Sequence, residues 1–209
     1  MAQPVLMSIA YMPSIAWFQQ VCAADKVILE KAENYQKQSY RTRCKILTAN
    51  GVMDLSIPVL HGNGKQLISE VFTQETENWR KQHWQAICSA YGKSAFFLFY
   101  RDALEKFFLK SEPVNLFEHN LALIDLLLKQ LKLKKEFEFT TSYEPKPTEL
   151  TDLRNSFHAK GNPLESELLF KETYFQVFAE KFPFQSNLSV LDLLFNVGPI
   201  AANYLRLKD

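Results

Sequence analysis

The chain opens with short apolar runs whose spacing predicts a strand, a helix and a second strand. Val5 to Ala10 is a largely apolar run typical of a buried strand, and Pro13-Ser14 ends it. From Ile15 to Ala24 the apolar residues recur at helical spacing, and Val27 to Leu29 forms the next apolar run. A strand, a helix and a strand this close together predict a βαβ crossover, and therefore a parallel pair of strands.

A β-hairpin follows, centred on Asn50-Gly51, because both residues tolerate the positive φ angles of a two-residue type I′ turn. Pairing outward from this turn places four pairs on one mostly apolar face: Thr48 with Met53, Ile46 with Leu55, Cys44 with Ile57, and Thr42 with Val59. The opposite face then carries Arg41, Arg43 and Lys45. We call these three residues the basic stripe and expect them to be accessible to solvent.

The rest of the chain is mostly helical in pattern. The expected elements are a strand at Leu67 to Phe72, helices from Glu77 (capped by Thr76) to Tyr91, from Ser94 to Phe108 and from Leu116 to Leu131, and a strand at Phe137 to Phe139. The pattern predicts a mixed α/β fold, in which the N-terminal βαβ unit and the hairpin form a central sheet and several helices follow. We expect the 209 residues to form a single domain, with a flexible loop or lid at 140–165.

Composition and charge narrow the function classes. The 24 basic and 23 acidic residues nearly cancel, so we expect no nucleic-acid partner. Three widely spaced cysteines favour a reducing compartment, and no window reaches 18 uncharged apolar residues; we therefore predict a cytoplasmic protein without a transmembrane segment. The chain contains no Gly-rich phosphate loop and no H-E-x-x-H motif, so no cofactor and no metal are expected.

Two groups of residues are candidates for binding or catalysis. The segment from Lys37 to Lys45 holds four basic residues and no acid, and its arginines suit phosphate or carboxylate oxygens; it is equally compatible with a solvated sheet face. Trp79, His83, Ile87 and Tyr91 share one helix face. Either His83 is a general base beside an aromatic wall, or it is a histidine at the edge of the core that bonds to a backbone carbonyl.

Two helix N-termini are further candidates for anion binding or helix capping. Pro13-Ser14 precedes a helix whose N-terminus could hold an anion. Ser189 and Asp192 form a Ser-x-x-Asp pattern, for which capping of a helix is the favoured role.

Several ordered blocks along the chain resemble the WbqC-like protein family. The main ones are Tyr11-Met12-Pro13-Ser14-Ile15-Ala16-Trp17-Phe18, Lys37-Gln38-x-Tyr40-Arg41-x-Arg43-Cys44-x-Ile46, Trp79-Arg80-x-x-His83, Tyr174-x-Gln176-x-Phe178 and the run from Leu188 to Pro199. Many members have His-Gln-Pro-Asn where this chain has Met7-Ser8-Ile9-Ala10. Many also carry a Tyr-Leu-Ser-Gly block before the Tyr-x-Gln segment, which has no counterpart here.

The resemblance implies a transferase of cell-surface polysaccharide biosynthesis, such as O-antigen or capsule assembly, that acts on an activated anionic donor such as a nucleotide-sugar. A non-catalytic binding or scaffold protein of the same pathway is the alternative. The candidate general bases are His83 and Glu30. The candidate ligand-binding residues are Lys37, Gln38, Tyr40, Arg41, Arg43, Trp79 and Tyr91.

Overall fold

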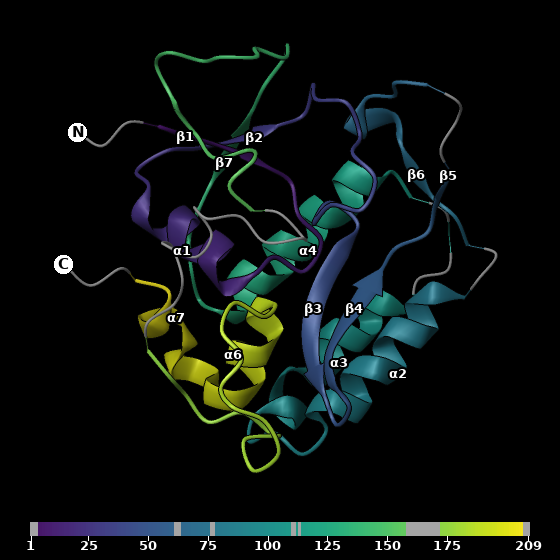
Figure 1. Cartoon of the computed structure of the whole chain (residues 1–209), viewed down its shortest axis with the longest axis vertical. Coiled ribbons are helices and arrows are strands. Elements are labelled where there is room, and N and C mark those ends of the chain that lie inside the picture. The colour runs from purple at the N-terminus through teal and green to yellow at the C-terminus, as the bar shows by residue number, and fades with distance from the viewer. Residues whose placement is uncertain are drawn as a thin grey trace.

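A computed structural model describes residues 4–60, 64–75, 78–109, 112, 114–157 and 172–206. It confirms the mixed α/β fold (Figure 1). Three small sheets are present in this part of the chain, one parallel and two antiparallel.

The parallel sheet is built around the N-terminal βαβ unit, as the apolar pattern predicted. Strand β1 (Val5–Ser8) leads through α1 (Ile15–Ala23) to β2 (Val27–Glu30), and β1 and β2 pair in parallel. β7 (Phe137–Phe139) joins the outer side of β2, and β8 (Thr151–Asp152) joins the free side of β1. The chain thus adds β2 and β7 on one side of β1 and β8 on the other, and the reversal point of the strand order lies between β1 and β8. Open α/β sheets bind ligands at such a point.

The predicted hairpin is present, but its register differs from the prediction by two residues. β3 (Arg43–Thr48) pairs with β4 (Gly51–Ser56) so that Thr48 faces Gly51 and Ile46 faces Met53. Only Gly51 takes a positive φ, at 103°, so the turn is Ala49-Asn50 followed by a left-handed glycine and not a type I′ turn. Because the shift is an even number of residues, every side chain keeps its predicted face.

The basic stripe is only partly as predicted. Arg43 and Lys45 are half-buried and lie on the face opposite the buried Cys44 and Ile46. Arg41 precedes the strand, and only 5% of its surface is exposed. The expectation that Arg41 is accessible was wrong because a buried carboxylate, described below, draws its guanidinium inward.

The helices and the remaining strands follow in the expected order. They are η1 (Ile68–Glu70), α2 (Trp79–Tyr91), α3 (Phe97–Phe108), α4 (Leu116–Gln130), α6 (Val190–Val197), η2 (Gly198–Ile200) and α7 (Ala201–Tyr204), with β5 (Val59–Leu60) and β6 (Phe72–Thr73) as a small ladder. The strand predicted at Leu67 to Phe72 is mostly the 3-10 turn η1. Ser94 bonds to the carbonyl of Tyr91 and does not cap α3, and Thr76 and Glu77 lie outside the described residues. Within the described ranges, none of the helices has both the length and the apolar character that crossing a bilayer requires.

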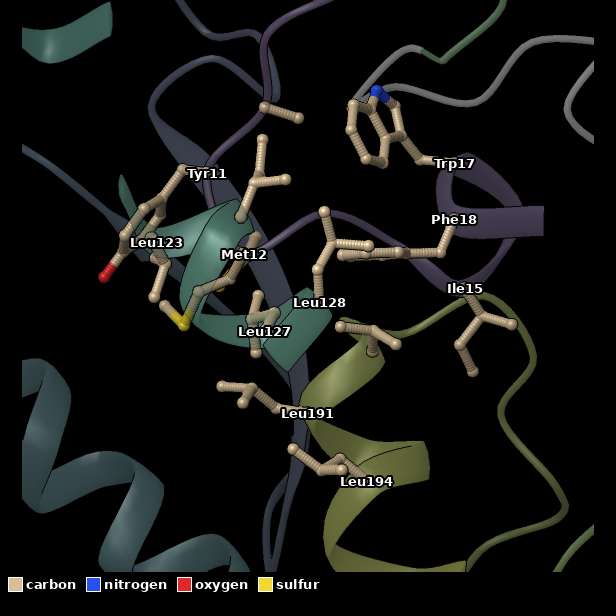
Figure 2. Close-up of a cluster of buried hydrophobic side chains, with 14 of the residues drawn as sticks. Tyr11, Met12, Ile15, Trp17, Phe18, Leu123, Leu127, Leu128, Leu191 and Leu194 are labelled. Carbon is tan, nitrogen blue, oxygen red and sulfur yellow. The ribbon is translucent and has the colours of Figure 1, made fainter. Parts of the chain in front are cut away.

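The core lies where α1, α4 and α6 meet (Figure 2). Leu127 and Leu128 of α4 lie near Leu191 of α6, while Met12 lies beside Leu123 and Leu127 and Phe18 extends from α1 toward Leu128. In Figure 1 the yellow α6 and α7 lie beside α1, and the β3–β4 hairpin lies beside α2 and α3. The N-terminal unit is thus buried by helices from the second half of the chain.

Gly198 directly follows α6 and packs against Phe96, the residue before α3. We expect the substitution Gly198→Ala to destabilise the fold. Gly198 has a φ of 61°, and an added Cβ would lie 2.4 Å from Cγ of Phe96. The steric overlap should add roughly 1–3 kcal/mol to the strain of a non-glycine residue at positive φ. The matched control is Gly64→Ala, since Gly64 also has a positive φ but its Cβ would contact nothing within 4 Å. Urea unfolding should show a clearly larger loss for Gly198→Ala; equal losses would mean that the packing against Phe96 is irrelevant.

Candidate functional site

Polar side chains gather at the carboxyl edge of the parallel sheet. β1 ends at Ser8, β2 ends at Glu30, and Thr140 and Asp152 stand at the ends of β7 and β8. Because the carboxyl ends of parallel strands meet at one edge, residues that are far apart in sequence come together here. This edge is the candidate site, and only Glu30 of these four residues was singled out from the sequence.

Arg154 joins three segments at this edge. Its Nη1 donates to Glu30 Oε2 at 2.9 Å, and its Nε and Nη2 donate to the two carboxylate oxygens of Asp152 at 2.9 and 2.7 Å. Nη2 also donates to the carbonyl of Glu144, and the guanidinium lies 4.7 Å from the ring centre of Tyr143. Burial by itself would raise the pKa of Asp152, but the hydrogen bonds and charge of Arg154 lower it.

Arg41 forms the second buried ion pair of the edge. Its Nε donates to Glu33 Oε1 and its Nη2 to the Ser8 hydroxyl, both at 2.7 Å, and Nη2 also bonds Glu33 Oε2. The Ser8 hydroxyl in turn donates to Glu33 at 3.1 Å. The third nitrogen, Nη1 of Arg41, has no hydrogen-bond partner among the described residues. One face of a fixed guanidinium is therefore available to a ligand.

Two small adjoining pockets lie beside these ion pairs. The first is lined by Ser8, Ile9, Ala10, Trp17, Tyr40, Arg41, Arg154 and Phe157. The second shares Ala10, Trp17, Tyr40 and Phe157 with it and adds Lys45, Ser14 and Ser189. Each has a volume of about 10 Å³, room for about one water molecule. A larger ligand must therefore displace a wall residue, and the half-buried Tyr40 and Phe157 form the shared wall.

The charges of the site are nearly balanced. Arg41 and Arg154 face Glu30, Glu33 and Asp152, so these five groups carry a net charge of −1. Lys45 lines the second pocket and makes no ion pair within the described part of the chain. The anion-binding capacity of the pockets thus depends on Lys45 and on the free nitrogen of Arg41.

Glu30 lies behind the pockets and does not line them. It is completely buried, and Oε1 accepts hydrogen bonds from the backbone N–H of Ala32 and from Thr140, while Oε2 accepts from Arg154. Both carboxylate oxygens are thus engaged by groups of the protein itself. The geometry therefore suits Glu30 to positioning Arg154.

His83 is part of a buried aromatic group and contacts the pockets only through Tyr11. Its Nδ1 lies 2.8 Å from the Tyr11 hydroxyl, and it also bonds to the backbone carbonyl of Ser56. A carbonyl can only accept, so His83 donates to Ser56 through Nε2 and accepts from Tyr11 through Nδ1. Burial, with a further contribution from the charge of Arg80, lowers the pKa of His83 to about 4.

The other predicted ligand-binding residues are dispersed. Trp79 and Tyr91 are almost fully buried in the core, Trp79 under the guanidinium of Arg80 and Tyr91 against the backbone N–H of Leu47. Lys37 and Gln38 are exposed, and Gln38 has a φ of 56°. Of the sequence candidates, Tyr40 and Arg41 line the first pocket.

The N-terminus of α1 is not open to an anion, contrary to the expectation from Pro13-Ser14. The first three backbone N–H groups of the helix bond to the Leu188 carbonyl, the Asn187 side chain and the Ser14 hydroxyl. The segment before α6 occupies the place where an anion would bind.

The helix start at Ser189 has two roles. Ser189 accepts a hydrogen bond from the backbone N–H of Leu191 and caps α6, as predicted. Asp192 instead accepts hydrogen bonds from Tyr174 at 2.6 Å and Gln176 at 2.8 Å, and burial raises its pKa although these bonds counteract the shift. Asp192 thus holds the segment that contains Tyr174 and Gln176 against α6, a role that the capping pattern did not reveal.

The fold and site define an α/β protein with two small pockets near the reversal point of a parallel sheet. The family model described as "WbqC-like protein family" matches residues 9–161, and the chain belongs to this family, as the sequence blocks indicated. An uncharacterized protein of Mycobacterium tuberculosis, Rv1507c, is 27% identical over 218 residues, which cover 94% of each chain. No solved structure matches the chain significantly.

The environment of His83 predicts a specific loss of stability in acid. His83 has a pKa of about 4 when folded and about 6.5 when unfolded, so the unfolded chain binds the proton more readily. The free energy of unfolding should therefore fall as the pH drops from about 6.5 to about 4, with a contribution from His83 of roughly 2 kcal/mol at pH 4.5.

Urea unfolding of the wild type and of His83→Gln at pH 7 and pH 4.5 measures this contribution. Glutamine can still accept a hydrogen bond from Tyr11 but does not titrate, so the variant should lose less stability between the two pH values. An equal loss in both proteins would show that His83 is not held neutral by the fold.

Proposed function

We propose that this protein binds an activated, phosphate-bearing sugar during the assembly of a cell-surface polysaccharide. The pathway is the one that the family resemblance implies. The observation that carries the proposal is Arg41, which lines the first pocket near the reversal point between β1 and β8 and whose Nη1 has no hydrogen-bond partner among the described residues. A guanidinium held on two sides by Glu33 and Ser8 is preorganised, so binding a phosphate oxygen requires little reordering of the side chain.

The second pocket extends the same site. Lys45 offers a second cation, while Ser14 and Ser189 are uncharged polar residues at its wall. We propose that a phosphate group binds between Arg41 and Lys45 and that Tyr40 and Phe157 move apart to admit the sugar. Aromatic side chains and hydroxyl groups suit a sugar ring, which has both apolar faces and hydroxyl groups.

The proposed lid at 140–165 is consistent with this arrangement. Residues 158–165 lie outside the described residues. Of the remainder, Thr140 and Arg154 both bond to Glu30, so the two ends of the exposed stretch between them are attached to the carboxyl edge. Up to Arg154, movement of the lid would therefore be confined to the residues between the two attachments, and Phe157 lies beyond them.

Binding without chemistry is the function that the pockets support best. Among the described residues that line them there is no Asp, Glu or His that could serve as a general base. Transfer of the sugar from its phosphate-bearing donor is the second candidate function. Arg41 favours it because a fixed guanidinium can stabilise the negative charge of a departing phosphate. In that case Tyr11, which lines the second pocket and bonds to His83, is the route by which His83 acts.

Substitutions at Arg41 test the binding proposal. Isothermal titration with UDP-glucose, dTDP-glucose and pyrophosphate should show that Arg41→Lys weakens binding by roughly tenfold or more, since a charged hydrogen bond contributes about 1.5–3 kcal/mol. Arg41→Ala would leave Glu33 buried without its partner, so the second variant is the double substitution Arg41→Met with Glu33→Met, which removes both charges together.

The matched control for Arg41 is Arg43→Gln, which removes a half-buried arginine that lies two residues away and lines neither pocket. It should change affinity less than twofold. Equal losses at both positions would assign anion binding to the exposed face of the hairpin. Failure of the wild type to bind any of the three probes would contradict the proposed function.

The transfer hypothesis makes its own prediction at His83. With a donor that binds, His83→Gln should lower turnover by roughly a hundredfold while donor affinity stays the same, if His83 acts through Tyr11. Thermal unfolding of the variant at neutral pH controls for lost structure. Unchanged turnover, or absence of turnover in the wild type with every sugar acceptor tested, would leave binding as the function.

A further inference from the structure

A hollow that is much larger than the two pockets lies away from them, at the opposite edge of the parallel sheet. It has a volume of about 560 Å³ and is formed by the last turn of α4 and the connection to β7: Asp125, Leu128, Lys129, Lys132, Leu133, Lys134, Lys135 and Glu136. β7 begins at Phe137, so the hollow adjoins the amino edge of the sheet. We call it the lysine hollow.

The charge of the lysine hollow is strongly positive. Four lysines and two carboxylates line it, which gives a net charge of +2 in a protein whose total is +1. Lys135 donates to the carbonyl of Ala24. The other three lysines, Lys129, Lys132 and Lys134, are exposed and make no ion pair within the described ranges. Their charges are therefore available to a partner.

The hollow also has an apolar floor. The floor consists of the half-buried Leu133 and the methylene stems of the surrounding lysines, whereas Leu128 beneath them is 4% exposed and belongs to the core. The backbone N–H of Leu133 bonds to the carbonyl of Leu128, which fixes the connection against the helix end. A free inorganic anion would use the lysines but not this floor. A ligand with an anionic group joined to an apolar part would use both.

We propose that the lysine hollow docks the protein on an anionic lipid surface, with the lysines at the phosphate headgroups and the half-buried Leu133 toward the acyl region. Basic clusters at a helix end bind acidic bilayers through additive contributions from each lysine. The pockets at the carboxyl edge then face away from the bilayer, because the two sites lie at opposite edges of one sheet. This proposal does not depend on the identity of the ligand in the pockets.

Co-sedimentation with vesicles tests the docking. The full chain is mixed with vesicles of phosphatidylcholine alone or of phosphatidylcholine and phosphatidylglycerol in a ratio of about three to one. We expect binding to the acidic vesicles only, and a marked loss of it at high salt because exposed charges are screened. The triple variant Lys129→Gln, Lys132→Gln, Lys134→Gln should lower the partition coefficient onto acidic vesicles by roughly a hundredfold, because each lysine near the surface contributes about a factor of five.

The matched control removes the same charge elsewhere. Lys81→Gln, Lys93→Gln and Lys106→Gln together replace three lysines that are also exposed but lie outside the hollow. This variant should bind acidic vesicles nearly as well as the wild type. Equal loss in both triple variants would overturn the proposal, because net charge and not the hollow would then control binding.

Two competition experiments distinguish a lipid surface from a free anion and from a protein partner. Inorganic phosphate, compared with chloride at equal ionic strength, should not displace the protein from vesicles; specific displacement would mean that the hollow takes a free anion. An acidic peptide such as polyglutamate that prevents vesicle binding at equal charge concentration would indicate a protein partner instead. Absence of binding by the wild type to the acidic vesicles would also overturn the proposal.

Discussion

Two buried ion pairs at the carboxyl edge of the parallel sheet hold the candidate site together. Arg154 joins the ends of β2 and β8, and Arg41 joins the end of β1 to Glu33. Charges removed from water are stable only when every partner is in place, and removal of one partner of such a pair costs roughly 3–5 kcal/mol. Four segments that are remote in sequence are therefore positioned relative to one another by two guanidinium groups.

The same ion pairs limit what the site can bind. Glu30, Glu33, Asp152, Ser8 and the carbonyl of Glu144 engage most donor groups of the two arginines, so among the described residues few cationic groups are left for an anion, chiefly Nη1 of Arg41 and Lys45. Such a site selects by geometry more than by charge. The departure from the family pattern at Met7 to Ala10 falls here as well, since Ser8, Ile9 and Ala10 line the first pocket.

Local patterns predicted the elements that depend on local physics. Helical spacing placed α1, α2 and α4 close to their observed positions, and the short connection from β1 to β2 implied their parallel pairing. The hairpin was predicted at the right place with the wrong turn, because Asn50-Gly51 permits both a type I′ turn and a turn in which only the glycine has a positive φ. Within the paired strands the face of each side chain was correct because it depends on parity alone, whereas Arg41 precedes the ladder and is buried.

The sequence by itself determined the fold class, the family, the βαβ unit, the hairpin and the main helices, since these follow from periodicity and from blocks of consecutive residues. The tertiary structure alone decided which polar residues meet. Glu33 and Arg154 carry no sequence signal, and Arg41 resembled a surface residue until its partner from a neighbouring segment was known. An ion pair depends on distance in space, and the strand order that brings β8 beside β1 is set by packing across more than a hundred intervening residues.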